Sequence, residues 1–213
     1  MSIGAAPGKH GETWGGYHDF AMDLPRAVSF HLPDWVFTEC DLTTPRPGDS
    51  ERMELAIELS RRNVEHGGGP FGAVVFERET GEVIAPGMNL VMPQASSLLH
   101  AEIVALMFAQ ARQQSFTLAR DNCELFASSE PCVQCLGACY WAGLSRLVCG
   151  APVELAESVG FDEGPRGPDW KEQLTVRGTP VVTGIQAERA GAILSAYADR
   201  GGFRYNARTP AIG

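Results

Sequence analysis

Apolar residues recur at helical spacing in several stretches of the chain. From Ser50, a possible N-cap, they recur every three to four positions until the glycines at 67–69, which predicts a first core helix. A second helix is predicted from about His100 to Gln114 and a third from about Cys132 to Ala142. The predicted buried stripe of the second helix is Ile103, Leu106, Met107 and Ala111.

Runs rich in β-forming residues lie between these helical stretches. Phe71 to Glu77 and Glu82 to Met92 read as two strands of a hairpin, joined by a turn that contains Gly81. Two further strands are predicted at Cys123 to Ser128 and at Arg146 to Gly150. The tail is predicted to hold a short helix near Asp169 to Thr175, a strand at Pro180 to Gly184 and a helix at about Glu188 to Arg200.

The alternation of strands and helices indicates an α/β fold. In such sheets, binding sites form beyond the carboxyl ends of strands, where helix N-termini point inward. We therefore expect the functional residues of the second and third helices to meet at one edge of the sheet.

The N-terminal part of the chain has a different character. Residues 1–48 are rich in Gly and Pro and show no sustained period, so we interpret them as an arm, with one folded domain at 49–213. Met1 to Asp23 is expected to be loosely ordered, and Ala27 to Phe37 alternates enough to predict a short strand or a wrapping segment.

Length and charge narrow the possible functions. A chain of 213 residues is long enough for one well-filled α/β domain and short for two. Its formal net charge of −9 argues against a nucleic-acid surface and favours a small, neutral substrate. Six cysteines without a signal-peptide pattern favour a reducing, cytoplasmic location, and no apolar run approaches the roughly 20 residues of a membrane span.

Two short motifs predict a catalytic zinc site, namely His100-Ala101-Glu102 and the segment 131–135, Pro-Cys-Val-Gln-Cys. Cysteines three positions apart at the start of a helix place both sulfurs on one face, where one Zn²⁺ ion can bind both. Pro131 suits the first helical position, and the free N–H groups and dipole there favour thiolate. His100 supplies a third ligand and leaves a fourth position for water, which is typical of catalytic zinc.

Glu102 has a different predicted role. It lies two residues from His100, too far round the helix to bind the same ion, and can instead reach the metal-bound water. The order H-x-E and then P-C-x-x-C is the signature of zinc-dependent nucleobase deaminases. The other cysteines of the predicted domain, Cys123, Cys139 and Cys149, are expected to be small buried hydrophobic residues.

From about Met53 to Arg208 the chain resembles the guanine deaminases of the cytidine deaminase superfamily. The resemblance rests on these segments: G-G-P-F-G-A-V-V-F at 68–76, Asn89, H-A-E-I at 100–103, E-P-C-V-Q-C-L-G-A at 130–138 and G-F-D-E-G-P-R at 160–166. The zinc motifs belong to the whole superfamily, so Gly-Phe-Asp-Glu at 160–163 is the part that discriminates among bases.

The resemblance implies a three-layer α/β/α fold with a five-stranded mixed sheet, and a homodimer in which the C-terminal segment lies near the partner's site. It implies that Glu163 contacts the polar edge of a purine, that Asn89 and Phe71 hold the ring, and that Ala101 also contacts the substrate. Phe203-Arg204-Tyr205-Asn206 is well placed to cover the pocket, with Tyr205 closing it.

The reading that follows is zinc-dependent hydrolysis of guanine to xanthine and ammonia, with Glu102 as proton shuttle and Glu163 orienting the base. Ammeline-like triazines, guanosine and cytosine are alternative substrates, and adenosine in tRNA is a fourth that the acidic charge disfavours. A structural zinc in an interaction module is an alternative of a different class. A fourth protein ligand would indicate it.

Overall fold

The computed structural model describes residues 25–208. Residues 25–31 belong to one compact unit and contain no helix or strand, while all the elements below belong to a second unit that begins at Leu32. The prediction for Met1 to Asp23 lies outside the described residues. The division into an arm at 1–48 and a catalytic domain at 49–213 stays a prediction.

Five strands form one mixed sheet in the order β2-β1-β3-β4-β5. They are β1 (Gly72–Glu77), β2 (Val83–Met88), β3 (Cys123–Ser129), β4 (Arg146–Ala151) and β5 (Val181–Val182). β1 is antiparallel to both β2 and β3, whereas β3, β4 and β5 are parallel. Because β2 and β3 are both antiparallel to β1, they run in the same direction and their carboxyl ends lie at the same edge of the sheet.

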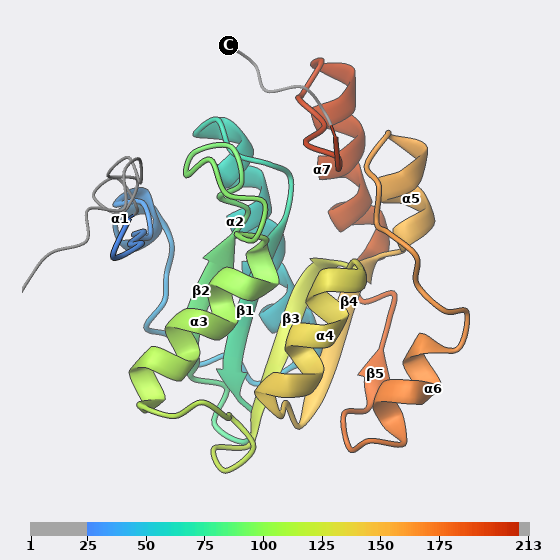
Figure 1. The fold of residues 1–213 in the computed structure, drawn as a ribbon. Coiled ribbons are helices and arrows are strands. Elements are labelled where there is room, and N and C mark those ends of the chain that lie inside the picture. Colours follow the sequence, from blue (N-terminus) through green and yellow to red (C-terminus); the bar gives the residue numbers. More distant parts are fainter. Residues whose placement is uncertain (1–24, 209–213) are drawn as a thin grey trace, which may run out of the picture. The chain divides into compact units, whose positions relative to one another are not determined.

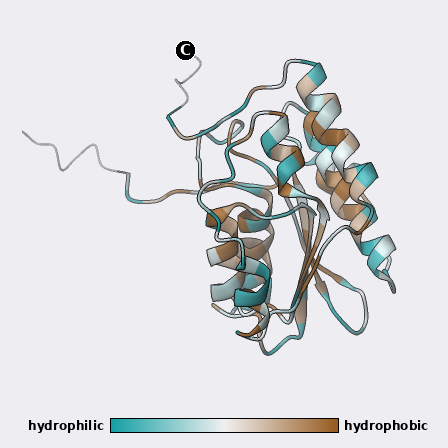
Figure 2. Ribbon diagram, turned by 90° about the vertical axis from the view of Figure 1, so that its right-hand side faces the viewer, coloured by the Kyte–Doolittle hydropathy of each residue, from teal (hydrophilic) through white to brown (hydrophobic). Residues whose placement is uncertain are grey.

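Helices cover both faces of this sheet (Figure 1). α2 (Asp49–Glu65) and α7 (Ala187–Asp199) pack on one face, and α3 (Ala101–Gln113) and α4 (Val133–Ala142) lie side by side on the other. Figure 2 shows the sheet edge-on between the two helical layers, with hydrophobic residues on the helix faces that line the sheet. The predicted three-layer α/β/α fold with a five-stranded mixed sheet is therefore confirmed. The remaining helices are α1 (Trp35–Glu39), α5 (Val153–Ser158) and α6 (Trp170–Thr175).

The strand predicted within Ala27 to Phe37 does not form, since this region instead begins the short helix α1. Trp35 is buried and its ring stacks on His66, just past the end of α2, at a centroid distance of 5.1 Å. Trp35 thus anchors α1 to the end of α2, and the alternative prediction of a wrapping segment stays a prediction.

The predicted buried stripe of α3 is mostly wrong. Leu106 is buried, but Ile103 is only half-buried, Ala111 is exposed and Met107 is 45% exposed. The buried face is made of Ala101, Val104, Ala105, Leu106 and Ala109. Small residues are favoured there because α3 approaches β2 so closely that a side chain at Gly87 would collide with the backbone of α3. The helix itself was predicted correctly. Which of its faces is buried depends on the close approach to β2, and not on where the largest apolar side chains lie.

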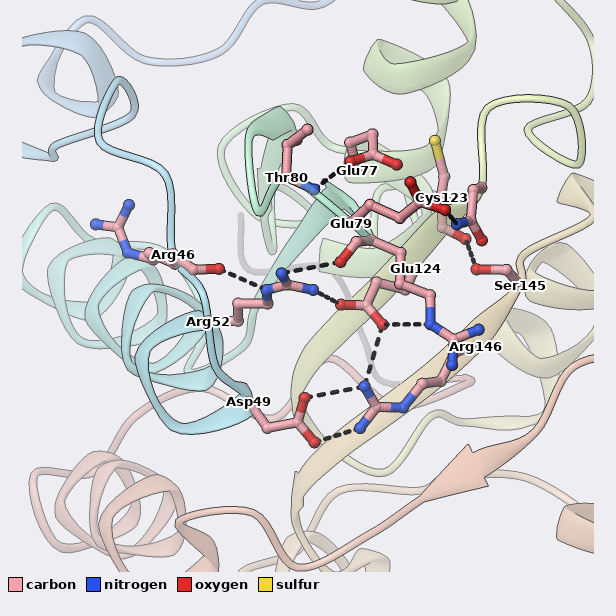
Figure 3. Close-up of polar contacts among 12 residues, drawn as sticks. Arg46, Asp49, Arg52, Glu77, Glu79, Thr80, Cys123, Glu124, Ser145 and Arg146 are labelled. Carbon is pink, nitrogen blue, oxygen red and sulfur yellow. Dashed lines mark hydrogen bonds and ion pairs between the residues drawn. The ribbon is translucent and has the colours of Figure 1, made fainter.

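The carboxylate of Glu124 links α2 and β4 to β3 at the amino end of β3, away from the carboxyl ends of β2 and β3 (Figure 3). Glu124, at the start of β3, is fully buried and forms ion pairs with Arg52 of α2 and with Arg146 of β4. Arg146 also pairs with Asp49 at the start of α2. Removing one partner from such a network leaves a buried charge without compensation, which is far more destabilising than losing an exposed pair.

We therefore expect Glu124→Ala to lower the free energy of unfolding by about 3–5 kcal/mol, because it leaves Arg52 buried without its carboxylate. Glu54→Ala is the matched control, since Glu54 and its partner Arg189 are both exposed, and its expected effect is about 0–1 kcal/mol. Urea denaturation measures both. Equal losses in the two variants would show that the buried network does not contribute as described.

Candidate active site

Three potential metal ligands converge at the edge of the sheet where β2 and β3 end. The His100 Nδ1 atom lies 3.4 Å from the Cys132 sulfur and 3.6 Å from the Cys135 sulfur, and the two sulfurs are 3.6 Å apart. Ligand bonds of about 2.0–2.3 Å in tetrahedral geometry separate neighbouring ligand atoms by roughly 3.3–3.8 Å, so these spacings fit one zinc ion. Within residues 25–208, no fourth His, Cys, Asp or Glu joins this cluster.

The local fold explains why these side chains meet. His100 is the N-cap of α3 and Cys132 is the N-cap of α4, so each helix starts at the cluster. Cys135 lies in the first turn of α4, three positions after Cys132, and its sulfur therefore lies beside that of Cys132. The sequence predicted Pro131 at the first helical position. This is wrong, because the helix begins at Val133 and Pro131 precedes the N-cap.

The charges in the cluster favour metal binding. The hydrogen bond with Cys135 and the neighbouring His100 ring together outweigh burial and lower the pKa of Cys132 to about 4. Burial acts to lower the pKa of His100, but the hydrogen bond with Cys132 and the thiolate charge raise it overall. A thiolate beside an imidazole and a second cysteine is a donor set suited to Zn²⁺.

The three cysteines predicted to be buried hydrophobic residues, Cys123, Cys139 and Cys149, are fully buried.

Two carboxyl groups face the same pocket. Burial, and then the nearby Cys132 thiolate, raise the pKa of Glu102 to about 7. The same two causes raise the pKa of Glu163 to about 8, with a further contribution from the charge of Glu102. A divalent cation bound between His100 and the cysteines would favour the ionised form of both groups. The sequence predicted both as functional residues, and the structure brings both to the pocket.

The pocket has a volume of about 670 Å³. Of the predicted substrate-binding residues, Phe71, Asn89, Glu163 and Tyr205 line it together with His100, Glu102 and Cys132. Ala101 does not line it, since its side chain packs in the core beneath α3. Any contact of Ala101 with a ligand must therefore come from its backbone.

Hydrogen bonds position Asn89, and Tyr205 packs beside it. The Asn89 side-chain oxygen accepts a hydrogen bond from the backbone N–H of Val91, and the amide of Asn63 donates to the Asn89 carbonyl. The hydroxyl of Tyr205 is buried, and burial raises the pKa of this group while the nearby Asn89 side chain acts to lower it. Tyr205 therefore lines the pocket with its hydroxyl turned into the protein, beside Asn89.

The C-terminal segment lies over this chain's own pocket. Asn206 accepts a hydrogen bond from the Asp162 N–H and donates one to the Gly160 carbonyl. Arg204 donates to the carbonyl of Val159. The tail is therefore fastened to the Gly-Phe-Asp-Glu segment, and the predicted contact with a partner's site stays a prediction.

Sequence reasoning missed several residues that shape the site. Asn63 supports the backbone at Asn89, and Phe161 packs edge-on against Phe71 at 5.0 Å and tilted against Tyr205 at 5.4 Å. Phe161 belongs to the Gly-Phe-Asp-Glu segment, so that motif could have pointed to it. Asn63 sits within an ordinary helical pattern, and no local signal marks it.

Comparisons with known proteins agree with this geometry. Residues 47–151 match the family model described as the cytidine and deoxycytidylate deaminase zinc-binding region. A guanine deaminase of Bacillus subtilis is 38% identical over 112 residues, which cover 52% of this chain and 69% of that protein. This chain belongs to the cytidine and deoxycytidylate deaminase family. It is a zinc-dependent aminohydrolase, in agreement with its His and Cys cluster.

Two other similarities place this deaminase within the family. The structure of a guanine deaminase from Nitrosomonas europaea is similar with a TM-score of 0.79 and 40% identity, covering 83% of this chain and 98% of that chain. A tRNA-specific adenosine deaminase of Haemophilus influenzae is 31% identical over 154 residues, which cover 70% of this chain and 82% of that protein. Within residues 25–208 of the deaminase, no helix is long and apolar enough to cross a membrane.

We expect the purified deaminase to hold one zinc ion per chain and Cys132→Ala to lose most of it, because the variant keeps only two of the three ligands. Glu102→Gln is the matched control and should retain its zinc, since Glu102 is not part of the cluster. Plasma mass spectrometry of the dialysed proteins measures both. Full zinc content and unchanged activity in Cys132→Ala would contradict the ligand assignment.

Proposed function

We propose that this deaminase hydrolyses guanine to xanthine and ammonia. The observation that carries the proposal is the position of Glu163, whose buried carboxyl group lines the same pocket as the His100, Cys132 and Cys135 cluster. The similarity to guanine deaminases supports the choice of base.

In this proposal His100, Cys132 and Cys135 hold the metal. When bound, zinc lowers the pKa of a water molecule to about 7 and so supplies a nucleophile at neutral pH for attack on C2 of guanine. Glu102 would take one proton from the attacking water and deliver it to N3, the ring nitrogen next to C2 that carries no proton. The second proton of the same water then passes to the C2 amine, the C2–N bond breaks, and ammonia leaves as the C2 carbonyl of xanthine forms, so that one guanine and one water are consumed. Glu102 lies buried in the pocket beside the cluster and is not one of its ligands, which suits it to accept and then donate this proton.

Glu163 orients the base. Guanine offers ring N–H groups and an amine as donors, and an ionised carboxylate has only acceptors, so the two are complementary. Burial raises the pKa of Glu163 and opposes ionisation, but donated hydrogen bonds and a nearby divalent cation both favour the carboxylate. Substrate and metal together therefore hold Glu163 in the form that recognises guanine.

The remaining pocket residues fit a flat purine. Phe71 and Phe161 supply aromatic surface for the ring. Asn89 can hydrogen-bond to its polar atoms, and Tyr205 adds a further aromatic ring to the lining. This set recognises both the faces and the edges of one small heterocycle.

We also propose that the deaminase is a cytoplasmic homodimer. None of the six cysteines forms a disulfide bond, which suits a reducing compartment. An exposed groove between α3 and α4 has no charged residue in its lining, which consists of Ile103, Leu106, Met107, Gln110, Phe116, Ala138, Trp141 and Ala142. In a chain of net charge −9, a neutral apolar face is where two copies can meet without repulsion, so we assign it to a second copy of this chain.

The proposed substrate is tested by ammonia release from guanine, guanosine, ammeline, cytosine, adenine and tRNA. We expect guanine to have the highest kcat/KM, and Glu102→Gln to lower the rate on guanine by roughly 10²- to 10⁴-fold, as for loss of a general acid–base group. Higher kcat/KM for any other member of the panel would reject guanine as the substrate.

Glu163→Gln should lower kcat/KM for guanine at least about tenfold, because one acceptor oxygen becomes a donor that faces the donors of guanine. Zinc content should be unchanged, since Glu163 is outside the metal cluster. Steady-state kinetics and metal analysis measure the two quantities. Kinetics within about twofold of the parent would mean that other residues select the base.

Trp141→Glu should convert the proposed dimer to a monomer, because Trp141 is 78% exposed on the α3–α4 face and a charge there resists burial. Val176→Glu is the matched control, an exposed apolar residue just after α6 that should leave the dimer intact. Analytical ultracentrifugation gives the mass of each. The α3–α4 face is not the interface if Trp141→Glu stays dimeric.

A further inference from the structure

The loop that carries Glu163 has no helix or strand from residue 161 to 167, so specific contacts must fix its path. Its backbone meets the start of α4 once, where the N–H of Val133 donates to the Glu163 carbonyl at 3.0 Å. Gly164 packs so closely on Val133 that an added Cβ would lie 2.6 Å from a Val133 methyl group. The loop therefore lies tightly against the helix that begins at a metal ligand.

Arg166 makes the strongest further link between the two segments. Its guanidinium donates to the carbonyl of Pro131 at 3.0 Å and pairs with Glu130 at 3.5 Å. It also lies over the ring of Trp170, 5.0 Å from the centroid. The side chain is only 10% exposed, so these contacts are made largely out of water.

Arg166 does more than form an ion pair with Glu130, because it also donates a hydrogen bond to the Pro131 carbonyl. The Pro131 carbonyl directly precedes Cys132, and Arg166 follows Glu163 by three residues. Glu130 does not depend on Arg166 for its charge balance, because Lys171 pairs with it at 2.7 Å. What Arg166 provides and Lys171 does not is a side-chain hydrogen bond from the loop of Glu163 to the carbonyl that precedes Cys132, which adds to the backbone hydrogen bond of Val133.

We propose that Arg166 is a positioning residue that sets the place of the Glu163 carboxylate relative to Cys132. This inference rests on the proposed role of Glu163 in binding the substrate. A rigid fork of donors that joins two segments holds both in one geometry, which a flexible point charge does not do equally well. Arg166 thereby couples recognition of the base to the metal site without touching the substrate.

The first test compares Arg166→Met with Lys171→Met. Arg166→Met keeps an apolar stem on Trp170 but loses the hydrogen bond to Pro131, so we expect kcat/KM for guanine to fall about tenfold, mainly through KM, with zinc content unchanged. Lys171→Met removes the other ion pair of Glu130 and should change kcat/KM less than about twofold. Equal losses in the two variants would overturn the proposal.

The decisive test is a double-mutant cycle with Glu163→Gln. If Arg166 acts through Glu163, the loss caused by Arg166→Met should shrink to less than about threefold once Glu163 is already changed. An undiminished loss in that background would show that Arg166 acts only on folding or on the metal turn. Should Arg166→Met not fold, Arg166→Lys takes its place in the cycle, because it keeps a charge and loses the fork.

The cycle also separates this inference from the proposed substrate. If the parent protein does not deaminate guanine, the proposed function is wrong, and the cycle is measured with the member of the substrate panel that has the highest kcat/KM. Coupling between the two residues on that substrate supports the positioning role. Additive losses there overturn it.

Discussion

The starts of α3 and α4 meet at one edge of the sheet, and the site depends on this arrangement. β2 and β3 run in the same direction because each is antiparallel to β1, so the helices that follow them both begin where those strands end. His100 and Cys132 are the N-caps of these helices, which brings the His100 ring within 3.4 Å of the Cys132 sulfur. Strand direction therefore places the metal ligands, and local sequence supplies their chemistry.

The proposed substrate recognition relies on a part of the chain that follows the metal-ligand motifs in the sequence. Glu163 lies in an irregular loop whose position depends on the hydrogen bond to Val133 and on Arg166. The C-terminal segment, through Asn206, fastens to the same loop and brings Tyr205 to the pocket. The metal centre thus rests on regular secondary structure, whereas the proposed base-binding wall rests on side-chain contacts between loops.

This difference explains how much the sequence could predict. The elements of the sheet, the metal ligands and Glu102 follow from periodicity and short motifs, because their geometry is set within a few residues. The buried face of α3 was mispredicted, since a close approach to β2 at Gly87 favours alanines over Met107. The support that Asn63 gives to Asn89, and that Arg166 gives to the Glu163 loop, joins segments far apart in the chain. Such contacts cannot be predicted from a local sequence pattern, because the two partners lie in different segments.

A crystal structure of the zinc-loaded protein with the guanine analogue 8-azaguanine tests the central claim most directly, namely that the metal site and Glu163 act on one bound base. We predict that the amine-bearing carbon of the analogue faces the metal held by His100, Cys132 and Cys135, and that its N–H edge donates to the Glu163 carboxylate. An analogue bound in the pocket with that edge turned away from Glu163 would contradict the account.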